Sequence, residues 1–207
     1  QQRIRREAVG GRQGLVTPPT NGREASSAGL LPHSPRGLEG NLSVTEALGR
    51  MSLRAKVAQL VFPPVYGDGR NRDEALDLAR AGVGGFVFYE GVSPADTAKL
   101  VAALREASEP TGLPLVIAAD QENGAGQVVQ GATELPPQMA FAAAGSAQLM
   151  YEAARNAGRE GRAMGFDLNC GPVADFTCPE VGPVEGGRSF GGDLRLMGAM
   201  LEATVRG

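Results

Sequence analysis

Short apolar runs alternate with amphipathic stretches along the chain, from about residue 43 to the last residue. A continuous apolar run bounded by glycines, such as the one at 86–89, is typical of a strand buried on both faces of a parallel sheet. Four runs of this kind are predicted strands: residues 61–66, 86–89, 115–119 and 166–169. The pattern therefore predicts four strands, or five at most.

Helix signals lie between these predicted strands. Serine and aspartate are favoured helix N-caps, and they precede stretches with apolar residues at helical spacing. These caps are Ser52, Ser93, Ser146 and Asp193. The helix after Ser52 should place Leu53, Val57, Leu60 and Val61 on one face, and further helices are predicted at 73–81, 94–107, 147–163 and 194–205. Gly82 and Gly165 follow two of these helices and are expected C-caps.

The alternation of strand and helix repeats about every 30 residues, which predicts βαβ units and a parallel sheet. An open doubly wound sheet and a closed barrel both use this pattern. Gly67 and Gly69 do not lead directly into a helix, as a dinucleotide-binding fingerprint requires, and this favours the barrel. A closed barrel needs eight strands. We therefore predict an α/β fold: an incomplete TIM-type (β/α)8 barrel, about its first half, with two unpaired strand edges.

Residues 1–42 differ from the rest of the chain. They are rich in arginine, glycine and proline and have almost no apolar periodicity. Such a segment buries too little surface to offset its ordering entropy, so we predict a disordered tail before a domain at 43–207. An arginine-rich arm also suits nucleic acid or lipid headgroups, but a solvated tail is the favoured interpretation. The single histidine, His33, lies in this tail.

Bulk composition limits the possible partners. Apolar residues make up 42% and charged residues 21%, and the formal net charge of −3 gives no reason to expect nucleic acid. No apolar run reaches the roughly 18 residues of a membrane span, and no signal-peptide pattern is visible. The chain begins at Gln1, so its compartment stays open. Cys170 and Cys178 fit no zinc-ligand spacing and are expected to be ordinary thiols, with no metal site.

Two connections that leave strands are much longer than the others. About 26 residues separate Ala119 from Ser146, and about 23 separate Asn169 from Asp193. Long loops at the carboxyl ends of parallel strands are where such folds place function. Asp120 opens the first loop. Its carboxylate can accept two hydrogen bonds from vicinal sugar hydroxyls, or it can cap local turn amides as an Asx motif.

The second loop contains Arg188, between two glycines and a serine. This arginine is placed to reach a ligand oxygen or a facing carboxylate, and the alternative is a solvated surface side chain. No catalytic pair is assigned from Asp120 with any other carboxylate of the domain, because such a pair needs a separation of about 5 Å that sequence does not show. The partners considered are Glu122, Asp167, Asp175 and Asp193.

Several segments, in their order along the chain, resemble the N-terminal domain of glycoside hydrolase family 3. The Asp-Gln-Glu sequence at 120–122 resembles the β-N-acetylhexosaminidase branch more than the β-glucosidases. Residues 125–129 depart from that branch, which commonly has arginines there. The matching segments are 51–60, 81–89, 113–124, 133–145, 159–176 and 187–193.

The resemblance implies a hydrolase of terminal β-linked sugars that retains anomeric configuration and needs no cofactor. It implies that Asp120 and Arg188 bind hydroxyls of the non-reducing sugar. A Lys-His motif, the acid/base and the aspartate nucleophile are expected beyond Gly207, so no catalytic residue is assigned here and the other half of the barrel is the expected partner. The alternatives are a β-glucosidase, an inert sugar-binding fragment and, less favoured, a nucleotide-binding doubly wound domain.

Overall fold

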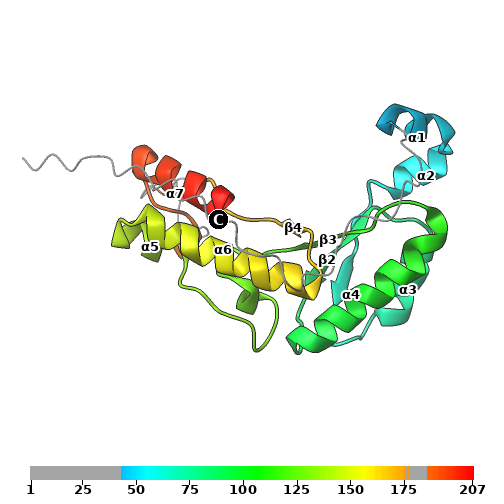
Figure 1. The fold of residues 1–207 in the computed structure, drawn as a ribbon, viewed down its shortest axis with the longest axis horizontal. Coiled ribbons are helices and arrows are strands. Elements are labelled where there is room, and N and C mark those ends of the chain that lie inside the picture. Colours follow the sequence, from blue (N-terminus) through cyan, green and yellow to red (C-terminus); the bar gives the residue numbers. More distant parts are fainter. Residues whose placement is uncertain (1–42, 176, 178–185) are drawn as a thin grey trace, which may run out of the picture. The chain divides into compact units, whose positions relative to one another are not determined.

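The computed structural model describes residues 43–175, 177 and 186–207, and contains one four-stranded parallel sheet (Figure 1). The predicted tail at 1–42, with His33, lies outside the described residues, as does Cys178. The strands are β1 Pro64–Tyr66, β2 Gly85–Tyr89, β3 Val116–Ala119 and β4 Leu168–Asn169. The prediction of an α/β fold with a parallel sheet is therefore confirmed.

The order of the strands distinguishes the two architectures that the sequence left open. The four strands pair in chain order, β1-β2-β3-β4, and all three pairs are parallel. A doubly wound sheet reverses direction after its first strands, whereas a barrel adds each new strand on the same side. Because parallel crossovers are right-handed, steady growth in one direction puts every connecting helix on one face. This half of a barrel has that topology.

The connecting helices begin and end close to the predicted positions. They are α3 Arg72–Arg80, α4 Pro94–Ser108 and α6 Ala147–Met164, and α7 Leu194–Arg206 follows β4. The side chains of Ser93, Ser146 and Asp193 each accept a hydrogen bond from a first-turn amide, as expected of N-caps. Along the chain α3 packs on α4, α4 on α6 and α6 on α7, so neighbours in sequence are neighbours in space (Figure 1).

Two helices were not predicted. The first, α1 Val44–Arg50, begins with a capping box in which Ser43 and Glu46 exchange hydrogen bonds. The second, α5 Gln138–Ala144, lies inside the 26-residue connection and shortens the true loop. Its alanines and methionine are strong helix formers, and Pro137 precedes its first turn. Short 3-10 turns complete the loops at Glu109–Thr111, Ala125–Gln127 and Gly186–Arg188.

The segment before β1 is the weakest part of the prediction. The helix after Ser52, α2 Leu53–Ala58, ends before Leu60 and Val61, and the predicted strand at 61–66 is formed only at its last three residues. All four apolar positions expected to share one face are exposed: Leu53, Val57, Leu60 and Val61. The prediction that these four residues share one helical face is therefore wrong for Leu60 and Val61, which lie beyond the end of α2. Strand β4 is likewise shorter than the predicted 166–169.

The main core lies between one face of the sheet and helices α3 and α4. Alternate strand residues point into it, including Val65, Phe86, Phe88 and Ile117, which are fully buried. Their neighbours on the opposite face are less enclosed, so the prediction that β2 is buried on both faces is wrong at Val87 and Tyr89. A second cluster, built around Phe141, Met150, Phe190 and Met200, joins α5, α6 and α7.

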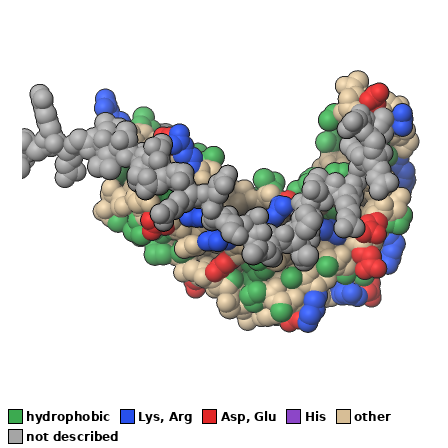
Figure 2. Space-filling model, viewed as in Figure 1, with side chains coloured by type: hydrophobic (Ala, Val, Ile, Leu, Met, Phe, Trp, Pro, Cys, Tyr) green, Lys and Arg blue, Asp and Glu red, His purple; other side chains and the backbone are tan. Residues whose placement is uncertain are grey.

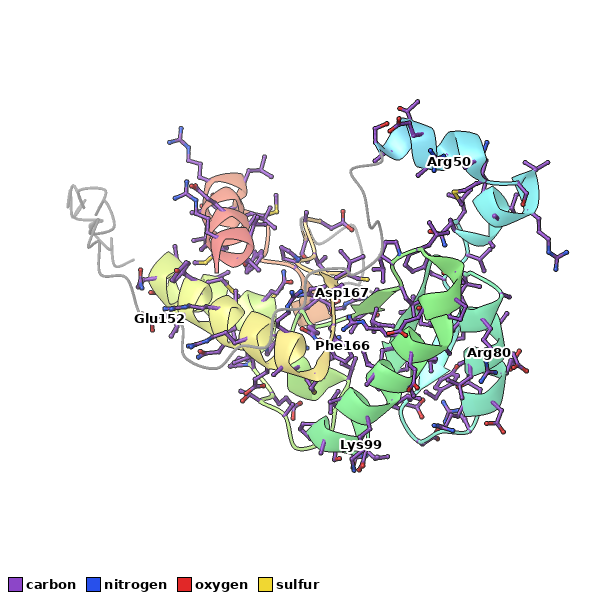
Figure 3. All side chains as sticks on the ribbon, turned by 45° about the vertical axis from the view of Figure 1, so that its right-hand side comes forward. Arg50, Arg80, Lys99, Glu152, Phe166 and Asp167 are labelled. Carbon is purple, nitrogen blue, oxygen red and sulfur yellow. The ribbon has the colours of Figure 1, made fainter. Side chains whose placement is uncertain are left out.

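A long-range ion pair fixes the start of β4. The guanidinium of Arg105 on α4 donates to the Gly165 carbonyl at 2.6 Å and to Asp167 Oδ2 at 2.8 Å. The same Asp167 oxygen accepts the Ile117 amide of β3 at 3.0 Å. Figure 3 shows Asp167 beside Phe166, whose ring packs 5.1 Å from that of Phe88. The entry to β4 is thus held by both polar and apolar contacts.

The outer edge of β1 is closed by a nearby side chain. Asn71 accepts the Tyr66 amide through Oδ1 at 3.1 Å and donates to the Pro64 carbonyl through Nδ2 at 2.9 Å. Pro64 itself has no amide hydrogen to leave unpaired. No described strand pairs with this outer edge of β1, as expected of a half barrel, and Asn71 satisfies two of its backbone groups in place of a strand.

Candidate functional site

The carboxyl ends of the four strands bring four side chains to one level of the sheet. Tyr66 of β1 pairs in register with Tyr89 of β2. Val87 of β2 pairs with Ala118 of β3, so the same register places Tyr89 beside Asp120 two residues later. Ala119 of β3 pairs with Asn169 of β4, so Asp120 lies beside Cys170 one residue later. Side chains at one level of neighbouring strands point to the same face. The predicted residue Asp120 therefore lies at the centre of a row, facing away from the helix-covered core.

The backbone around Asp120 is fixed by the neighbouring strand end. Asn169 Oδ1 accepts the amides of Gln121 and Gly171, each at 3.0 Å, and so joins the starts of the two functional loops. Burial raises the pKa of Tyr89, and the negative charge of Asp120 adds to that effect. Burial also raises the pKa of Cys170, again with contributions from the charge of Asp120 and a hydrogen bond to it. The carboxylate of Asp120 therefore influences the groups on both sides of it.

Arg188, the second predicted residue, meets a carboxylate from the first loop. Its Nη2 donates to Oε1 of Glu122, and the other oxygen of Glu122 accepts Gln127 Nε2 at 2.6 Å. The side chain of Glu122 is 3% exposed, whereas that of Arg188 is 55% exposed. The sequence predicts that Arg188 contacts a ligand oxygen or a facing carboxylate, or is solvated. The structure shows contact with a carboxylate, which belongs to Glu122 and not to Asp120.

The environment of Glu122 keeps its carboxyl group ionised. Burial raises the pKa of Glu122, but hydrogen bonds from Arg188, from a backbone amide and from Gln127 outweigh that effect. The pKa therefore lies below its usual value. A buried anion of this kind can hold a half-exposed guanidinium at a fixed place on the loop surface. Glu122 thus positions Arg188 close to the strand end that carries Asp120.

Sequence reasoning missed this role of Glu122. The sequence offered one signal, since Glu122 lies two residues after Asp120 in the loop predicted to be functional. Its partner lies 66 residues away in the second loop, and no local pattern joins the two. A second tie joins the same loops, because Gln138 of α5 exchanges two hydrogen bonds with the backbone of Val173 at 3.0 and 3.2 Å.

The glutamine between Asp120 and Glu122 packs tightly against α6. A Cβ atom at Gly161 would lie 2.8 Å from Gln121 Oε1, so a side chain at this position would require the Gln121 amide to shift. Gln121 and Glu122 also line a cavity of about 300 Å³ between the two loops and helices α6 and α7. Asp120 and Arg188 lie outside that lining. The cavity is therefore separate from the row of strand-end side chains.

Two of the other carboxylates considered from the sequence have structural roles. Asp167 lies at the opposite end of β4 from Cys170 and pairs with Arg105. Asp193 caps α7 through the amides of Arg195 and Leu196. Within the described ranges there is no group of three or more histidine, cysteine or acidic side chains placed to hold a metal ion. No described helix is both long and apolar enough to cross a membrane.

Comparison with known proteins agrees with this topology. The family model described as "Glycosyl hydrolase family 3 N terminal domain" matches residues 52–207. The chain belongs to glycoside hydrolase family 3. The described β1–β4 segment is part of a TIM-type barrel.

Individual relatives that the chain resembles are named as glycosidases. A "Beta-N-acetylglucosaminidase/beta-glucosidase" of Cellulomonas fimi is 38% identical over 118 residues, which cover 57% of this chain and 20% of the relative. A solved family 3 β-N-acetylglucosaminidase from Paenibacillus sp. is 37% identical, with a TM-score of 0.69 over 75% of this chain and 30% of that one. A β-N-acetylhexosaminidase from Beutenbergia cavernae is 28% identical, with a TM-score of 0.65 over 75% and 50%. The chain thus spans at most half the length of these relatives.

Proposed function

We propose that this chain forms the sugar-binding half of a family 3 glycosidase of β-N-acetylhexosaminidase type, which cleaves terminal β-linked sugars with retention. The observation that carries the proposal is the position of Asp120, at the centre of the row of strand-end side chains and open to the face away from the core. Active sites of (β/α)8 enzymes lie at this end of the strands. The names of the relatives support the class of substrate.

In this proposal the carboxylate of Asp120 accepts hydrogen bonds from two sugar hydroxyls. Arg188, held by Glu122, supplies positive charge and donors from the second loop. Charge-assisted bonds of this kind are stronger than neutral ones and are directional, so they fix the orientation of the sugar ring. The attacking carboxylate and the acid/base are supplied by groups outside these 207 residues, so the chain alone binds sugar without hydrolysing it.

A second candidate is a β-glucosidase of the same family. The relative from Cellulomonas fimi is named for both activities, and residues 125–129 lack the arginines of the hexosaminidase branch. The two candidates differ in the substituent at carbon 2 of the bound sugar. They are separated by comparing N-acetylglucosamine with glucose as ligands.

Isothermal titration calorimetry of the 207-residue chain with these two sugars tests the proposal. We expect N-acetylglucosamine to bind more tightly than glucose and Asp120→Ala to weaken binding about tenfold to a hundredfold, because two charge-assisted hydrogen bonds are lost. The matched control is Asp77→Ala on α3, whose side chain is 78% exposed and which should change nothing. Unchanged binding by Asp120→Ala would remove the proposed role of that residue.

The absence of turnover needs its own assay. We expect no release of nitrophenol from nitrophenyl β-N-acetylglucosaminide or nitrophenyl β-glucoside by the 207-residue chain. Turnover that persists after purification to homogeneity and is lost in Asp120→Ala would show that the chain holds its own catalytic residues. Tighter binding of glucose than of N-acetylglucosamine would favour the second candidate.

A further inference from the structure

Two tyrosines occupy the same level of the sheet as Asp120, at the ends of the two preceding strands. We propose that Tyr66 and Tyr89 form a second wall of the sugar site, and that the Tyr89 hydroxyl donates to a sugar hydroxyl held by Asp120. This inference rests on the proposed sugar-binding role of Asp120. It extends the site from the loops after β3 and β4 to the ends of β1 and β2.

The direction of the two side chains follows from strand alternation. Val65 and Phe88, the residues before Tyr66 and Tyr89, are fully buried in the core under the helices. Side chains of adjacent strand residues point to opposite faces, so both tyrosines point to the face that carries Asp120. Their ring centroids lie 6.0 Å apart with the planes tilted by 33°, and both residues are only partly buried. The two rings therefore form one continuous aromatic surface.

An arginine fixes this surface from the side of β1. The guanidinium carbon of Arg70 lies 3.6 Å from the centroid of the Tyr66 ring, within cation–π range. Two ion pairs hold the guanidinium, with Asp68 at 3.0 Å and Glu90 at 2.7 Å. Glu90 directly follows Tyr89 and adopts a φ of 55°, which is uncommon for a residue with a side chain. The β1 and β2 ends are thus joined by a charged bridge beside the aromatic surface.

The chemistry of a sugar hydroxyl explains why Asp120 needs a hydrogen-bond donor, such as the Tyr89 hydroxyl, close to it. An ionised carboxylate only accepts hydrogen bonds, whereas a hydroxyl both donates and accepts. When binding excludes water, the accepting lone pairs of the sugar oxygen need a donor close to Asp120. Burial and the charge of Asp120 both raise the pKa of Tyr89, so its phenol remains protonated and able to donate at neutral pH. The ring faces suit the C–H faces of a pyranose, and the chain has no tryptophan.

The small number of aromatic chromophores makes the inference measurable. The chain has three tyrosines and no tryptophan, and the third tyrosine, Tyr151, packs in the helical cluster with α7. In Tyr151→Phe all tyrosine emission comes from Tyr66 and Tyr89. We expect N-acetylglucosamine to change that emission with the same midpoint that calorimetry gives. We also expect Tyr89→Phe to weaken binding about threefold to tenfold, as for loss of one hydrogen bond.

The double variant Tyr66→Phe/Tyr89→Phe provides the matched comparison, since only Tyr151 still emits. Its emission should not respond to sugar, and its far-ultraviolet circular dichroism should match that of the parent chain. If sugar binds with dependence on Asp120 while Tyr89→Phe binds as tightly as the parent, the tyrosine wall is refuted and the proposed function stands. If the parent chain binds neither sugar, the proposed function fails and the tyrosine wall fails with it.

Discussion

The two ends of the sheet are stabilised in different ways. At the β1 end, a single side chain five residues beyond Tyr66, that of Asn71, satisfies the outer edge of the strand. At the β4 end, the contacts join residues far apart in sequence, such as Arg105 with Asp167 and Glu122 with Arg188. Local contacts can be made as soon as a segment is compact, whereas distant ones need the whole unit to be assembled. The contacts at the β4 end therefore form only when the whole unit has folded. The loops that carry Glu122 and Arg188 lie at that end.

The charges of the two ends also differ in their exposure. The ion pairs beside β1, between Arg70 and its two carboxylates, are solvent-accessible on both partners. The carboxylate of Glu122 is almost completely buried. Exposed pairs contribute little to stability, whereas a buried charge becomes costly when its partner is removed. On the visible part of the face that Figure 2 shows, acidic and basic side chains are interspersed, as expected of exposed pairs.

The largest effect is expected at the β4 end, from Arg188→Met. This substitution leaves the buried Glu122 without its cation and should lower the free energy of unfolding by about 2 kcal/mol, measured by urea denaturation. Arg206→Met is the matched control, because Arg206 and its partner Glu202 are 67% and 60% exposed, and it should change stability by less than about 0.5 kcal/mol. Adding Glu122→Gln to Arg188→Met should restore part of the loss. Equal effects of the two arginine substitutions would contradict the contrast between the ends.

A smaller effect is expected at the β1 end, from Asn71→Ala. The Tyr66 amide and the Pro64 carbonyl would then turn to solvent, at a cost of about 1 kcal/mol in unfolding free energy. Asn71→Asp keeps the acceptor for the Tyr66 amide and should lose less. Light scattering of the alanine variant should rise with concentration, since an uncovered strand edge is available to other chains. A chain that stays monomeric and equally stable would show that Asn71 does not close this edge.

The smallest effect is a pH dependence confined to the β4 end. The pKa of Glu122 lies below its unfolded value of 4.5, so its contribution to stability is fully present above that pH and is lost as pH falls through the folded pKa. Unfolding free energies of the parent and Glu122→Gln should therefore converge on acidification. The difference between the parent and Asn71→Ala should stay constant over the same range, because an amide does not titrate. A constant difference for Glu122→Gln would argue against a perturbed carboxylate.

Sequence patterns predicted those features that depend on neighbouring residues. The serine and aspartate caps of α4, α6 and α7 fixed helix starts to the residue, since a cap needs only the amides two or three positions later. Periodicity failed at α2, where apolar spacing predicted one helical face for four residues but the helix ends before Leu60 and Val61, and all four are exposed. Burial depends on what lies opposite a helix, and the sequence of the helix does not record this.

In the candidate site too, features that depend on neighbouring residues were predicted and features that depend on distant residues were not. The placement of Asp120 followed from one strand end, and the family resemblance added Arg188. The identity of the partner of Arg188 did not follow, because the pairing with Glu122 depends on how the two loops approach each other. The tyrosine pair was also missed, since the register between β1 and β2 brings the two rings together across 23 residues of sequence.

The strictly sequential order of the strands has a consequence for synthesis on the ribosome. Each strand pairs with the one made immediately before it, so every strand emerges to find its partner already present. Domains fold as units while translation proceeds at about 5–20 residues per second. A sheet that grows by addition at one edge can acquire order during translation, while Asn71 satisfies the outer backbone groups of β1. The growing edge is that of β4, beside the two loops that carry Glu122 and Arg188.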